Sequence, residues 1–272
     1  MKTINLESYE TVNQTQAYHD VSEKYSFIPT NRVIGVLEKL NWLPVNIQEK
    51  SCRKPEMFGF QKHVVRFRSP NFAPIQKLGD TSPSIILTNS HNRGSAFNLL
   101  MGLDRQVCGN GLVVSIGEFI NFSVRHIGYT DDKILEAIEA LQKGIPEVLD
   151  KIEAWSAIKL NDFEMKAYAK SACQLRYDDN DLPNVDRLLM PVRYEDKENN
   201  LFNVFNRVQE KLIKGQKSYR SKSIRAIKGI DQNLKLNKAL WTLTNEMELL
   251  KNNLPGSIET SLNQIESREL VS

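Results

Sequence analysis

The sequence predicts an α+β fold, in which a small antiparallel sheet carries one packed helix and a mostly helical C-terminal half follows. Three observations predict it. Residues 58–125 contain segments rich in β-branched and aromatic side chains, some with period-two alternation. From residue 130 onwards, apolar side chains recur at helical spacing. The chain has 272 residues, of which 40% are hydrophobic and 25% charged, an ordinary globular composition with enough length for a sizeable core.

The first predicted element is a helix over residues 31–40, where apolar side chains fall on one face. Thr30 or Asn31 can cap its start, and Pro44 lies just beyond its end. Residues 1–24 are polar and are predicted to form a flexible N-terminal arm.

The sheet is predicted from two strands and a hairpin. Residues 58–68 alternate and residues 84–89 are rich in Ile and Leu, so both are expected to be strands. Residues 95–107 are predicted to be the packed helix, and its buried stripe comprises Leu99, Leu100, Leu103 and Val107. The hairpin is expected over residues 112–125, with its turn at Gly117.

The C-terminal half is predicted to be helical. A helix begins after Thr130, which can cap it, and the pattern resumes after an interruption at Gly144 and Pro146. Residues 162–175 form the next helix, and from Leu201 the chain is helical and basic. The last apolar stripe comprises Leu236, Leu240, Leu243, Met247 and Leu250.

These patterns divide the chain into four parts. We expect a flexible N-terminal arm at residues 1–24, an α+β core domain at residues 25–185, a basic helical region at residues 186–253 and a flexible tail at residues 254–272.

Composition argues against several classes of protein. No basic segment followed by an apolar run opens the chain, and no stretch approaches the ~20 apolar residues of a membrane span, so we expect a cytoplasmic protein without a membrane partner. Cys52, Cys108 and Cys173 are widely spaced, which argues against a disulfide framework and a zinc site. Since no cofactor motif or metal-ligand spacing occurs, neither a cofactor nor a metal is expected.

The segment from Phe205 to Lys238 has a strong charge imbalance. It holds ten basic residues and two acids, a balance of 10 − 2 = +8, whereas the whole chain is +3 and the rest therefore sums to 3 − 8 = −5. Such asymmetry is an electrostatic footprint for a polyanion, and a tyrosine there can stack on a base. The predicted nucleic-acid-binding residues of this segment are Arg207, Lys211, Lys214, Lys217, Tyr219, Arg220, Lys222, Arg225 and Lys228. The alternative is a solvated helix face or a mobile loop.

Lys62, Arg66 and Arg68 extend this predicted interface, because they share strand parity with Phe58 and Phe60. Aromatic rings beside cations on an exposed sheet surface form a stacking platform for single strands. The alternative is that the phenylalanines are core and the cations guard a sheet edge.

His63, His91 and His126 are the candidate chemical histidines. None has the spacing of a metal-ligand pair, and the sequence holds no nucleophile elbow, Walker lysine loop or dinucleotide fingerprint. The polar loop with Asn89, His91 and Arg93 is expected mainly to fix the turn before the predicted helix, with an enzyme site as the alternative.

Three motifs follow one another in this region: Thr88-Asn89-Ser90-His91, then Cys108-Gly109-Asn110-Gly111-Leu112-Val113-Val114, then Arg125-His126-Ile127-Gly128. With them the chain resembles the phage/plasmid-like protein family, also described as domain of unknown function 932, over about Phe27 to Leu250. The resemblance implies a mobile-element or bacteriophage origin and an intracellular protein. It implies no reaction, and it supplies no catalytic residues.

The favoured function is non-catalytic: a phage- or plasmid-encoded nucleic-acid-binding protein that binds or anneals single-stranded DNA in replication or recombination, working as a homo-oligomer. One alternative is a protein-binding inhibitor of a host defence system, and the other is an enzyme with a site around Asn89, His91 and Arg93. A continuous basic groove would favour nucleic acid, and a broad apolar patch would favour a protein partner. A histidine with a strongly shifted pKa beside a concave pocket would favour an enzyme.

Overall fold

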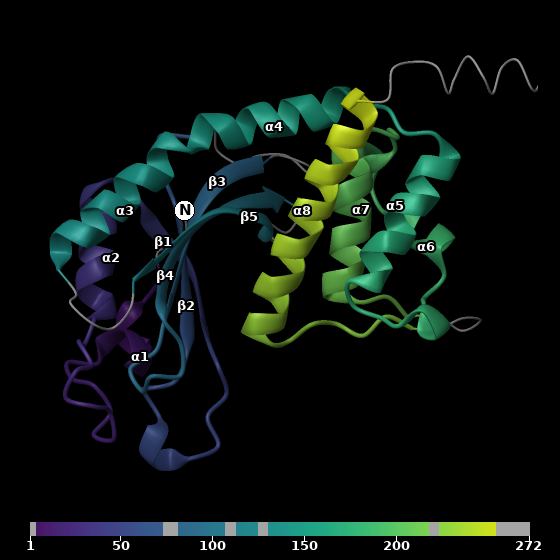
Figure 1. The fold of residues 1–272 in the computed structure, drawn as a ribbon. Coiled ribbons are helices and arrows are strands. Elements are labelled where there is room, and N and C mark those ends of the chain that lie inside the picture. The colour runs from purple at the N-terminus through teal and green to yellow at the C-terminus, as the bar shows by residue number, and fades with distance from the viewer. Residues whose placement is uncertain (1–3, 73–80, 107–112, 125–129, 218–222, 254–272) are drawn as a thin grey trace, which may run out of the picture. The chain divides into compact units, whose positions relative to one another are not determined.

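The computed structural model describes residues 4–72, 81–106, 113–124, 130–217 and 223–253 (Figure 1). The chain splits into two compact units. The sheet unit comprises Met1–Lys151 and Ile227–Lys238, and the helical unit comprises Ile152–Ala226 and Ala239–Ser272. The units divide the chain after Lys151, Ala226 and Lys238, so the first part of the last helix belongs to the sheet unit.

The sheet unit is built on a five-stranded antiparallel sheet in the order β1-β2-β3-β4-β5. The strands are β1 (Leu43–Glu49), β2 (His63–Arg68), β3 (Thr81–Asn89), β4 (Phe97–Gln106) and β5 (Val113–Val124). Each strand pairs with the next one along the chain, so the sheet is a meander. Together with the helical second half, this sheet confirms the predicted α+β class.

Two helices pack with the sheet, α2 (Thr30–Lys39) and α3 (Asp131–Lys143). They contact each other, and α2 contacts β1 while α3 contacts β4 and β5 (Figure 1). Both bury side chains at helical spacing, which is the amphipathic pattern that a core-facing helix needs. The buried apolar side chains are Val33, Ile34 and Leu37 in α2, and Ile134, Ala137, Ile138 and Leu141 in α3.

The predicted helix over residues 95–107 is wrong, because β4 occupies most of this segment. Leu99, Met101 and Leu103 alternate on one face of the sheet and are fully buried. Leu100 points to the opposite face, where it packs with Ile86 and is also buried. A strand buried on both faces is a continuous apolar run, and such a run also matches helical spacing.

The predicted hairpin around Gly117 is also wrong, since β5 is one strand from Val113 to Val124. Gly117 pairs with Leu103 inside the β4–β5 ladder, next to a shift of register. The glycine therefore lies at an irregularity within a strand and not at a turn.

The predicted strand over residues 58–68 is shorter than expected. It begins at His63, and the preceding residues form a 3-10 turn, η2 (Pro55–Met57), and further turns. Gly59 has φ +86°, a left-handed conformation that ends extended structure. Phe58 and Phe60 therefore do not share a strand face with Arg66.

The predicted N-terminal arm contains ordered turns over the part that is described. These are η1 (Leu6–Ser8) and α1 (Glu10–Asn13). Thr11 and Val12 are fully buried. Residues 1–3 and the predicted tail at residues 254–272 lie outside the described residues.

The helical unit contains α5 (Asp162–Gln174), α6 (Val185–Leu189) and α7 (Leu201–Lys214), with the later part of α8 (Ile230–Asn253) and the end of α4 (Ile145–Ala157). Two 3-10 turns, η3 (Asp179–Asp181) and η4 (Tyr194–Asp196), complete it. Its core is aromatic: ring centroids of Trp155 and Trp241 lie 4.1 Å apart, and those of Trp155 and Phe205 lie 5.8 Å apart.

Local sequence signals explain where these helices begin. Asn161 and Glu164 form a capping box at the start of α5, in which each side chain bonds the backbone N–H of the other. Asn200 caps α7, since its side chain accepts from the backbone N–H of Asn203 at 2.8 Å. Among the described helices, none is both long and apolar enough to cross a membrane.

Candidate nucleic-acid interface

Arg207 and Lys211 of α7 point into the helical unit, although the sequence placed them on an exposed basic surface. Arg207 is 4% exposed and Lys211 5% exposed. The Arg207 guanidinium donates from Nη1 to the carbonyl of Leu189 at 2.9 Å, and from Nη2 to the carbonyl of Glu198 at 3.1 Å. The prediction that these two cations face solvent is wrong.

Lys211 donates hydrogen bonds to backbone carbonyls at the C-terminal end of α6. Its ammonium donates to the carbonyls of Arg187 at 2.8 Å and Leu188 at 3.0 Å, and also to that of Met190. Carbonyls at a helix C-terminus have no partner within the helix and carry partial negative charge, so a buried cation stabilises them. The pKa of Lys211 is lowered to about 8, mainly by burial and also by the charge of Arg207, although the carboxylates of Glu210 and Asp196 act in the opposite direction.

Two further predicted cations form ion pairs. Lys214 Nζ lies 3.0 Å from the Glu210 carboxylate, and Lys62 Nζ lies 2.5 Å from that of Asp231. The Lys62 side chain is only 12% exposed, whereas that of Lys214 is 32% exposed. The Lys62 side chain is therefore packed within the sheet unit, whereas part of the Lys214 side chain is exposed to solvent.

Arg66 and Arg68 converge on one buried carboxylate. Arg68 Nε donates to Asp104 Oδ2 at 2.9 Å, and Arg66 Nη1 lies 4.0 Å from Asp104 Oδ1. Asp104 also accepts from the Ser84 hydroxyl at 3.2 Å. The two arginine side chains are 18% and 19% exposed and that of Asp104 is 3% exposed, so the expectation of an open basic sheet surface is wrong here.

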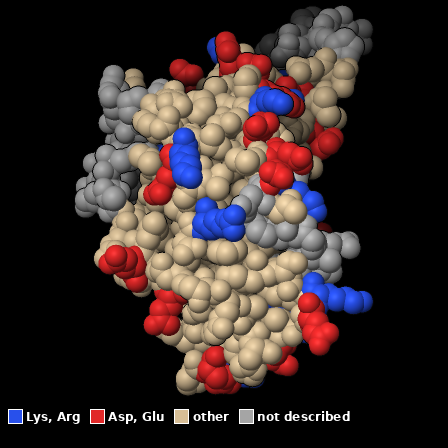
Figure 2. All heavy atoms as spheres, turned by 90° about the vertical axis from the view of Figure 1, so that its left-hand side faces the viewer, with Lys and Arg blue, Asp and Glu red and all other residues tan. Residues whose placement is uncertain are grey.

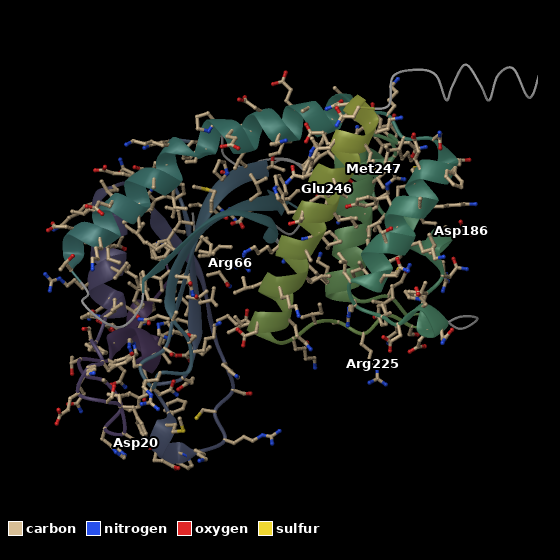
Figure 3. The ribbon with its side chains drawn as sticks, viewed as in Figure 1. Asp20, Arg66, Asp186, Arg225, Glu246 and Met247 are labelled. Atoms are coloured by element: carbon tan, nitrogen blue, oxygen red, sulfur yellow. The ribbon has the colours of Figure 1, made fainter. Side chains whose placement is uncertain are left out.

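The remaining predicted cations lie between α7 and α8. Lys217, Arg225 and Lys228 are exposed, whereas Tyr219, Arg220 and Lys222 lie outside the described residues. We name residues 215–226 the basic loop. It holds Lys217, Arg220, Lys222 and Arg225 and no acidic residue. Figure 3 shows the side chain of Arg225 pointing away from the chain that carries it.

The two ends of the basic loop are paired with each other. Gln216 and Ile224 form an antiparallel bridge, with N–H to carbonyl distances of 2.8 and 2.9 Å. Gly215 allows the chain to turn from α7 into the basic loop. Its φ is +81°, and a Cβ there would lie 2.6 Å from the carbonyl oxygen of Ile224. Only glycine adopts this backbone conformation without strain.

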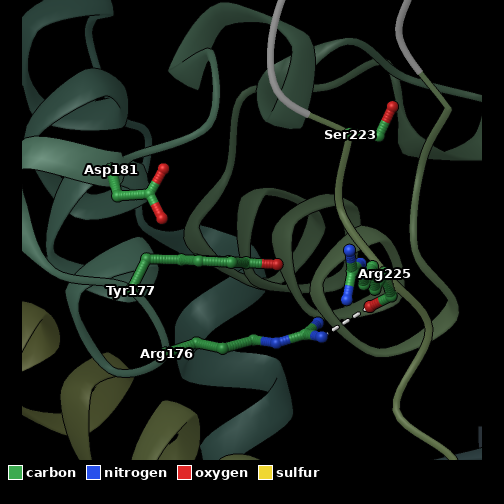
Figure 4. Close-up of a pocket in the computed structure, with 5 residues that line it drawn as sticks. All are labelled: Arg176, Tyr177, Asp181, Ser223 and Arg225. Atoms are coloured by element: carbon green, nitrogen blue, oxygen red, sulfur yellow. Dashed lines mark hydrogen bonds between the residues drawn. The ribbon is translucent and has the colours of Figure 1, made fainter.

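Arg176, just after α5, braces the same loop. Its Nη2 donates to the carbonyl of Arg225 at 2.5 Å, and its Nη1 donates to the carbonyl of Leu212 (Figure 4). One guanidinium therefore ties the end of α5 to α7 and to the basic loop itself. The sequence analysis missed this residue, because an isolated arginine after a helix carries no pattern.

A pocket of about 720 Å³ opens beside this brace in the helical unit (Figure 4). Its described lining residues are Arg176, Tyr177, Asp181, Ser223 and Arg225. The Arg176 guanidinium carbon lies 5.2 Å from the centre of the Tyr177 ring, within the range of a cation–π contact. Ser223 and Arg225 come from the basic loop, so the loop forms one wall of the pocket.

The loop motif around His91 forms a buried polar cluster in the sheet unit. Thr11, Thr30, His63, Asn89, Ser90 and His91 are all 0% exposed. Asn89 Nδ2 donates to Thr30 Oγ1 at 3.0 Å, and Thr30 Oγ1 lies 2.8 Å from His63 Nε2. His91 Nε2 donates to the carbonyl of Thr11 at 2.8 Å, which attaches the N-terminal segment to the end of β3.

This cluster accounts for the shifted titration of His63. The pKa of His63 is lowered to about 3, mainly by burial and also by the nearby His91, although the bond to the carbonyl of Gln61 acts in the opposite direction. Such a shift follows from desolvation of a fully buried ring.

Arg93 stands apart, exposed and with φ +61°, so the three residues of the candidate enzyme site do not form one exposed group. No helix starts at Ser95, whose N–H instead donates to the Ser90 hydroxyl at 2.8 Å.

On the face shown in Figure 2, blue and red side chains are scattered over a mostly tan surface, and cations do not gather in one place. Within the described part of the chain, no group of three His, Cys, Asp or Glu side chains has the arrangement of a metal site.

Comparison with known proteins gives a family match and two relatives. Residues 17–241 match the family described as "Domain of unknown function (DUF932)". The chain is 34% identical over 230 residues to the UPF0380 protein YafZ of Escherichia coli (strain K12), and 33% identical over 230 residues to the UPF0380 protein YfjQ of the same organism. Each alignment covers 82% of this chain and 82% of the relative. No solved structure matches the chain.

Proposed function

The chain belongs to the family described as "Domain of unknown function (DUF932)", and within it we propose a nucleic-acid-binding protein of phage or plasmid origin that binds or anneals single-stranded DNA through the basic loop. The observation that carries this proposal is the concentration of positive charge in the sequence of the basic loop, together with the exposure of its described cations, Lys217 and Arg225. Four cations occur in residues 215–226 without a carboxylate, and Lys228 follows two residues later.

The proposal uses fewer residues than the sequence predicted. Arg207, Lys211, Lys62, Arg66 and Arg68 are engaged by carbonyls or carboxylates within their own units. The binding residues that we retain are Lys217, Tyr219, Arg220, Lys222, Arg225 and Lys228, with Lys214 at the margin. Phosphate contacts from such cations give affinity with little sequence preference, which suits a protein that coats or anneals strands.

A charge-reversal variant tests the proposal. Lys217→Glu/Arg225→Glu/Lys228→Glu should lower the affinity for a labelled single-stranded oligonucleotide at least tenfold, because phosphate attraction becomes repulsion. In the wild type, the logarithm of the affinity should fall with the logarithm of the salt concentration, with a slope of about −0.7 per contacted phosphate. A fluorescence titration between 50 and 300 mM salt measures both.

A matched variant separates the basic loop from net charge. Lys39→Glu/Lys50→Glu/Lys54→Glu makes the same charge change at three exposed lysines of the sheet unit. It should leave affinity within about twofold, since none of these lysines belongs to the proposed binding residues and a change of net charge alone is screened by salt. If both variants lose affinity equally, or if neither does, the basic loop is not the binding surface.

Protein binding is the second candidate, and one observation favours it. Met190, Val192 and Tyr194 are 61%, 67% and 79% exposed in one short segment of the helical unit. Adjacent exposed apolar side chains are typical of surfaces that a partner covers, either a second copy or a host protein. If copies associate through them, Val192→Ser/Tyr194→Ser should shift sedimentation toward the monomer, and an unchanged profile would leave this segment without that role.

A further inference from the structure

Arg66, on β2 of the sheet unit, is a largely buried arginine whose bonding is incomplete (Figure 3). Its Nη1 is buried without a hydrogen-bond partner, and Asp104 Oδ1 lies 4.0 Å away, beyond the reach of a hydrogen bond. Among the residues that the structure describes, none accepts a hydrogen bond from this guanidinium. Since a buried N–H group without an acceptor costs free energy, an acceptor from outside the chain would stabilise Arg66.

The Asp104 carboxylate does not neutralise both arginines that approach it. Arg68 Nε donates to its Oδ2 at 2.9 Å, and the Ser84 hydroxyl donates to its Oδ1 at 3.2 Å. Arg66, Arg68 and Asp104 together carry a formal charge of 2 − 1 = +1. A net charge on side chains that are mostly buried is unfavourable unless a counter-ion accompanies it. The cluster therefore favours an anion with one negative charge.

The register of the sheet brings two side chains of β1 next to the two arginines. Asn46 is the partner of Arg66, and Leu43 is the partner of Arg68, in the antiparallel β1–β2 ladder. Partners in such a ladder place their side chains on the same face, with Cβ atoms about 4.5–5.5 Å apart. Asn46 is exposed and Leu43 is 37% exposed, while each arginine side chain keeps just under a fifth of its surface. A small ligand can therefore approach the arginines from the β1 side.

The chemistry of these four side chains indicates a carboxylate. A carboxylate carries one negative charge, and its two oxygens match the parallel N–H groups of a guanidinium. A terminal phosphate carries about −1.5 to −2 near neutral pH and would leave an excess of negative charge beside Asp104. The Asn46 amide is a further donor, and the Leu43 side chain is an apolar surface for a short aliphatic chain.

We propose that the sheet unit binds a small aliphatic monocarboxylate, with Arg66 and Arg68 on the carboxylate oxygens and Leu43 on the aliphatic chain. The site goes beyond the proposed function, because it lies wholly in the sheet unit and uses no residue of the basic loop. Failure of either one therefore leaves the other unaffected.

The first test titrates the full chain with acetate, butyrate and inorganic phosphate at constant ionic strength in sodium chloride. The readout is the NMR shift of the arginine Nε–H signals. Acetate and butyrate should shift the signals of Arg66 and Arg68, and butyrate should bind severalfold more tightly because its chain contacts Leu43. Leu43→Asn should reduce the preference for butyrate to under about twofold and leave acetate binding unchanged.

Substitutions of Arg66 test the carboxylate contact itself. Arg66→Gln should lower butyrate affinity at least tenfold, and Arg66→Lys should lower it less, because the charge remains while the paired donors are lost. Lys39→Gln removes an exposed lysine of the sheet unit and should leave the affinity within about twofold.

Thermal unfolding separates a ligand site from a structural ion pair. Without ligand, Arg66→Gln should melt at the same temperature as the wild type or higher, because Arg66 donates no hydrogen bond within the described structure. Butyrate at ten times its Kd should raise the folding equilibrium constant of the wild type about elevenfold and should leave that of Arg66→Gln unchanged.

Several results would overturn the proposal. These are the absence of any shift of the Arg66 and Arg68 signals, wild-type butyrate affinity in Arg66→Gln, and equal losses of affinity in Arg66→Gln and Lys39→Gln. Tighter binding of inorganic phosphate than of butyrate would also overturn it. A lower melting temperature of Arg66→Gln, with no effect of butyrate on the wild type, would make Arg66 a purely structural residue.

Discussion

His63 is a buried histidine with both ring nitrogens engaged. Its Nδ1 donates to the carbonyl of Gln61 at 3.2 Å, and its Nε2 accepts from Thr30 Oγ1 at 2.8 Å. These bonds use the neutral ring, and a second imidazole lies 5.2 Å away between ring centroids, that of His91. A proton added at Nε2 would remove the lone pair that accepts from Thr30 and would bring a positive charge into the core.

The stability of the fold should therefore fall in mild acid. In the unfolded chain His63 takes up a proton near pH 6.5, whereas in the fold its pKa is about 3. Stability is thus complete above pH 6.5 and is lost as the pH falls from 6.5 toward 3, by roughly 2 kcal/mol at pH 5.

Urea unfolding at pH 7 and pH 5 measures this loss. His63→Gln should remove about 2 kcal/mol of the pH dependence, while His19→Gln, at an exposed histidine, should retain it. An identical pH dependence in wild type and His63→Gln would show that another group is responsible.

A single glycine tests whether the shape of the basic loop matters apart from its charge. Gly215→Ala places a Cβ 2.6 Å from the Ile224 carbonyl at a φ of +81°, so it should cost roughly 1–3 kcal/mol and weaken the Gln216–Ile224 bridge. We expect a lower melting temperature and a several-fold lower DNA affinity, although no charge changes.

Gly35→Ala is the matched control. Gly35 lies within α2, and a Cβ there meets no atom within 4 Å, so the change should stabilise the helix by roughly 0.5–1 kcal/mol and leave DNA affinity unchanged. DNA affinity that is unaffected by Gly215→Ala would mean that charge alone determines binding.

Among the elements, α7 shows most clearly how a sequence pattern can mislead. Arg207, Lys211 and Lys214 recur at intervals of four and three residues, so they lie along one side of the helix. The pattern states that they share a side, but it does not state whether that side faces solvent. The carbonyls that receive Arg207 and Lys211 come from residues 187–199, and no local signal reveals that contact.

A substitution in α7 distinguishes packing from DNA binding. Lys211→Met removes the donor of three carbonyls and should lower the free energy of unfolding by roughly 2–4 kcal/mol, because buried acceptors are left unsatisfied. Lys214→Met, at the partly exposed lysine that pairs with Glu210, should cost under about 1 kcal/mol.

Chemical unfolding and the oligonucleotide titration give the two readouts. The folded Lys211→Met protein should bind DNA as the wild type does. A stable Lys211→Met protein that has lost DNA binding would instead place Lys211 in the interface.

The strands show where sequence reasoning succeeds and where it stops. α2 and α5 were predicted within a residue or two, because helical spacing of apolar side chains is a local signal. The predicted cap of α2 is wrong: its N-cap is Pro29, which has no side-chain bond, and Thr30 Oγ1 bonds His63 and Asn89 instead. β4 was taken for a helix, because burial on both faces removes the alternation that identifies a strand. The candidate interface was only partly predictable: charge marks the basic loop, but Arg176 and Tyr177 enter through tertiary contacts alone.

For the whole molecule, the positive charge is concentrated in the basic loop. The basic loop carries +4, so the rest of the chain sums to 3 − 4 = −1. Under the proposed function, a strand should therefore be attracted to the loop more than to the rest of the protein. In the described structure the other predicted cations are mostly neutralised within each unit, by Asp104 and Asp231 in the sheet unit and by Glu210 in the helical unit.

Hydrogen exchange can locate the bound strand across the whole chain. With saturating single-stranded DNA, backbone amides from the end of α7 through the basic loop should exchange more slowly, and those of β1 to β4 should not change. Slower exchange in the sheet strands, with none in the basic loop, would move the interface to the sheet unit.

The meander of the sheet has a consequence for the order of folding. Every strand pairs with its neighbour in sequence, so the sheet needs no distant segment to form its ladders and can assemble as the chain emerges from the ribosome. One of its faces, however, carries Val64, Ile86 and Leu100, and these pack with Ile230 and Leu234 at the start of α8. Those two residues are synthesised about 130 positions after Leu100. At the ~5–20 residues per second of translation, this apolar face stays uncovered for several seconds or more after its synthesis, and transiently exposed apolar surface of this kind is prone to aggregation.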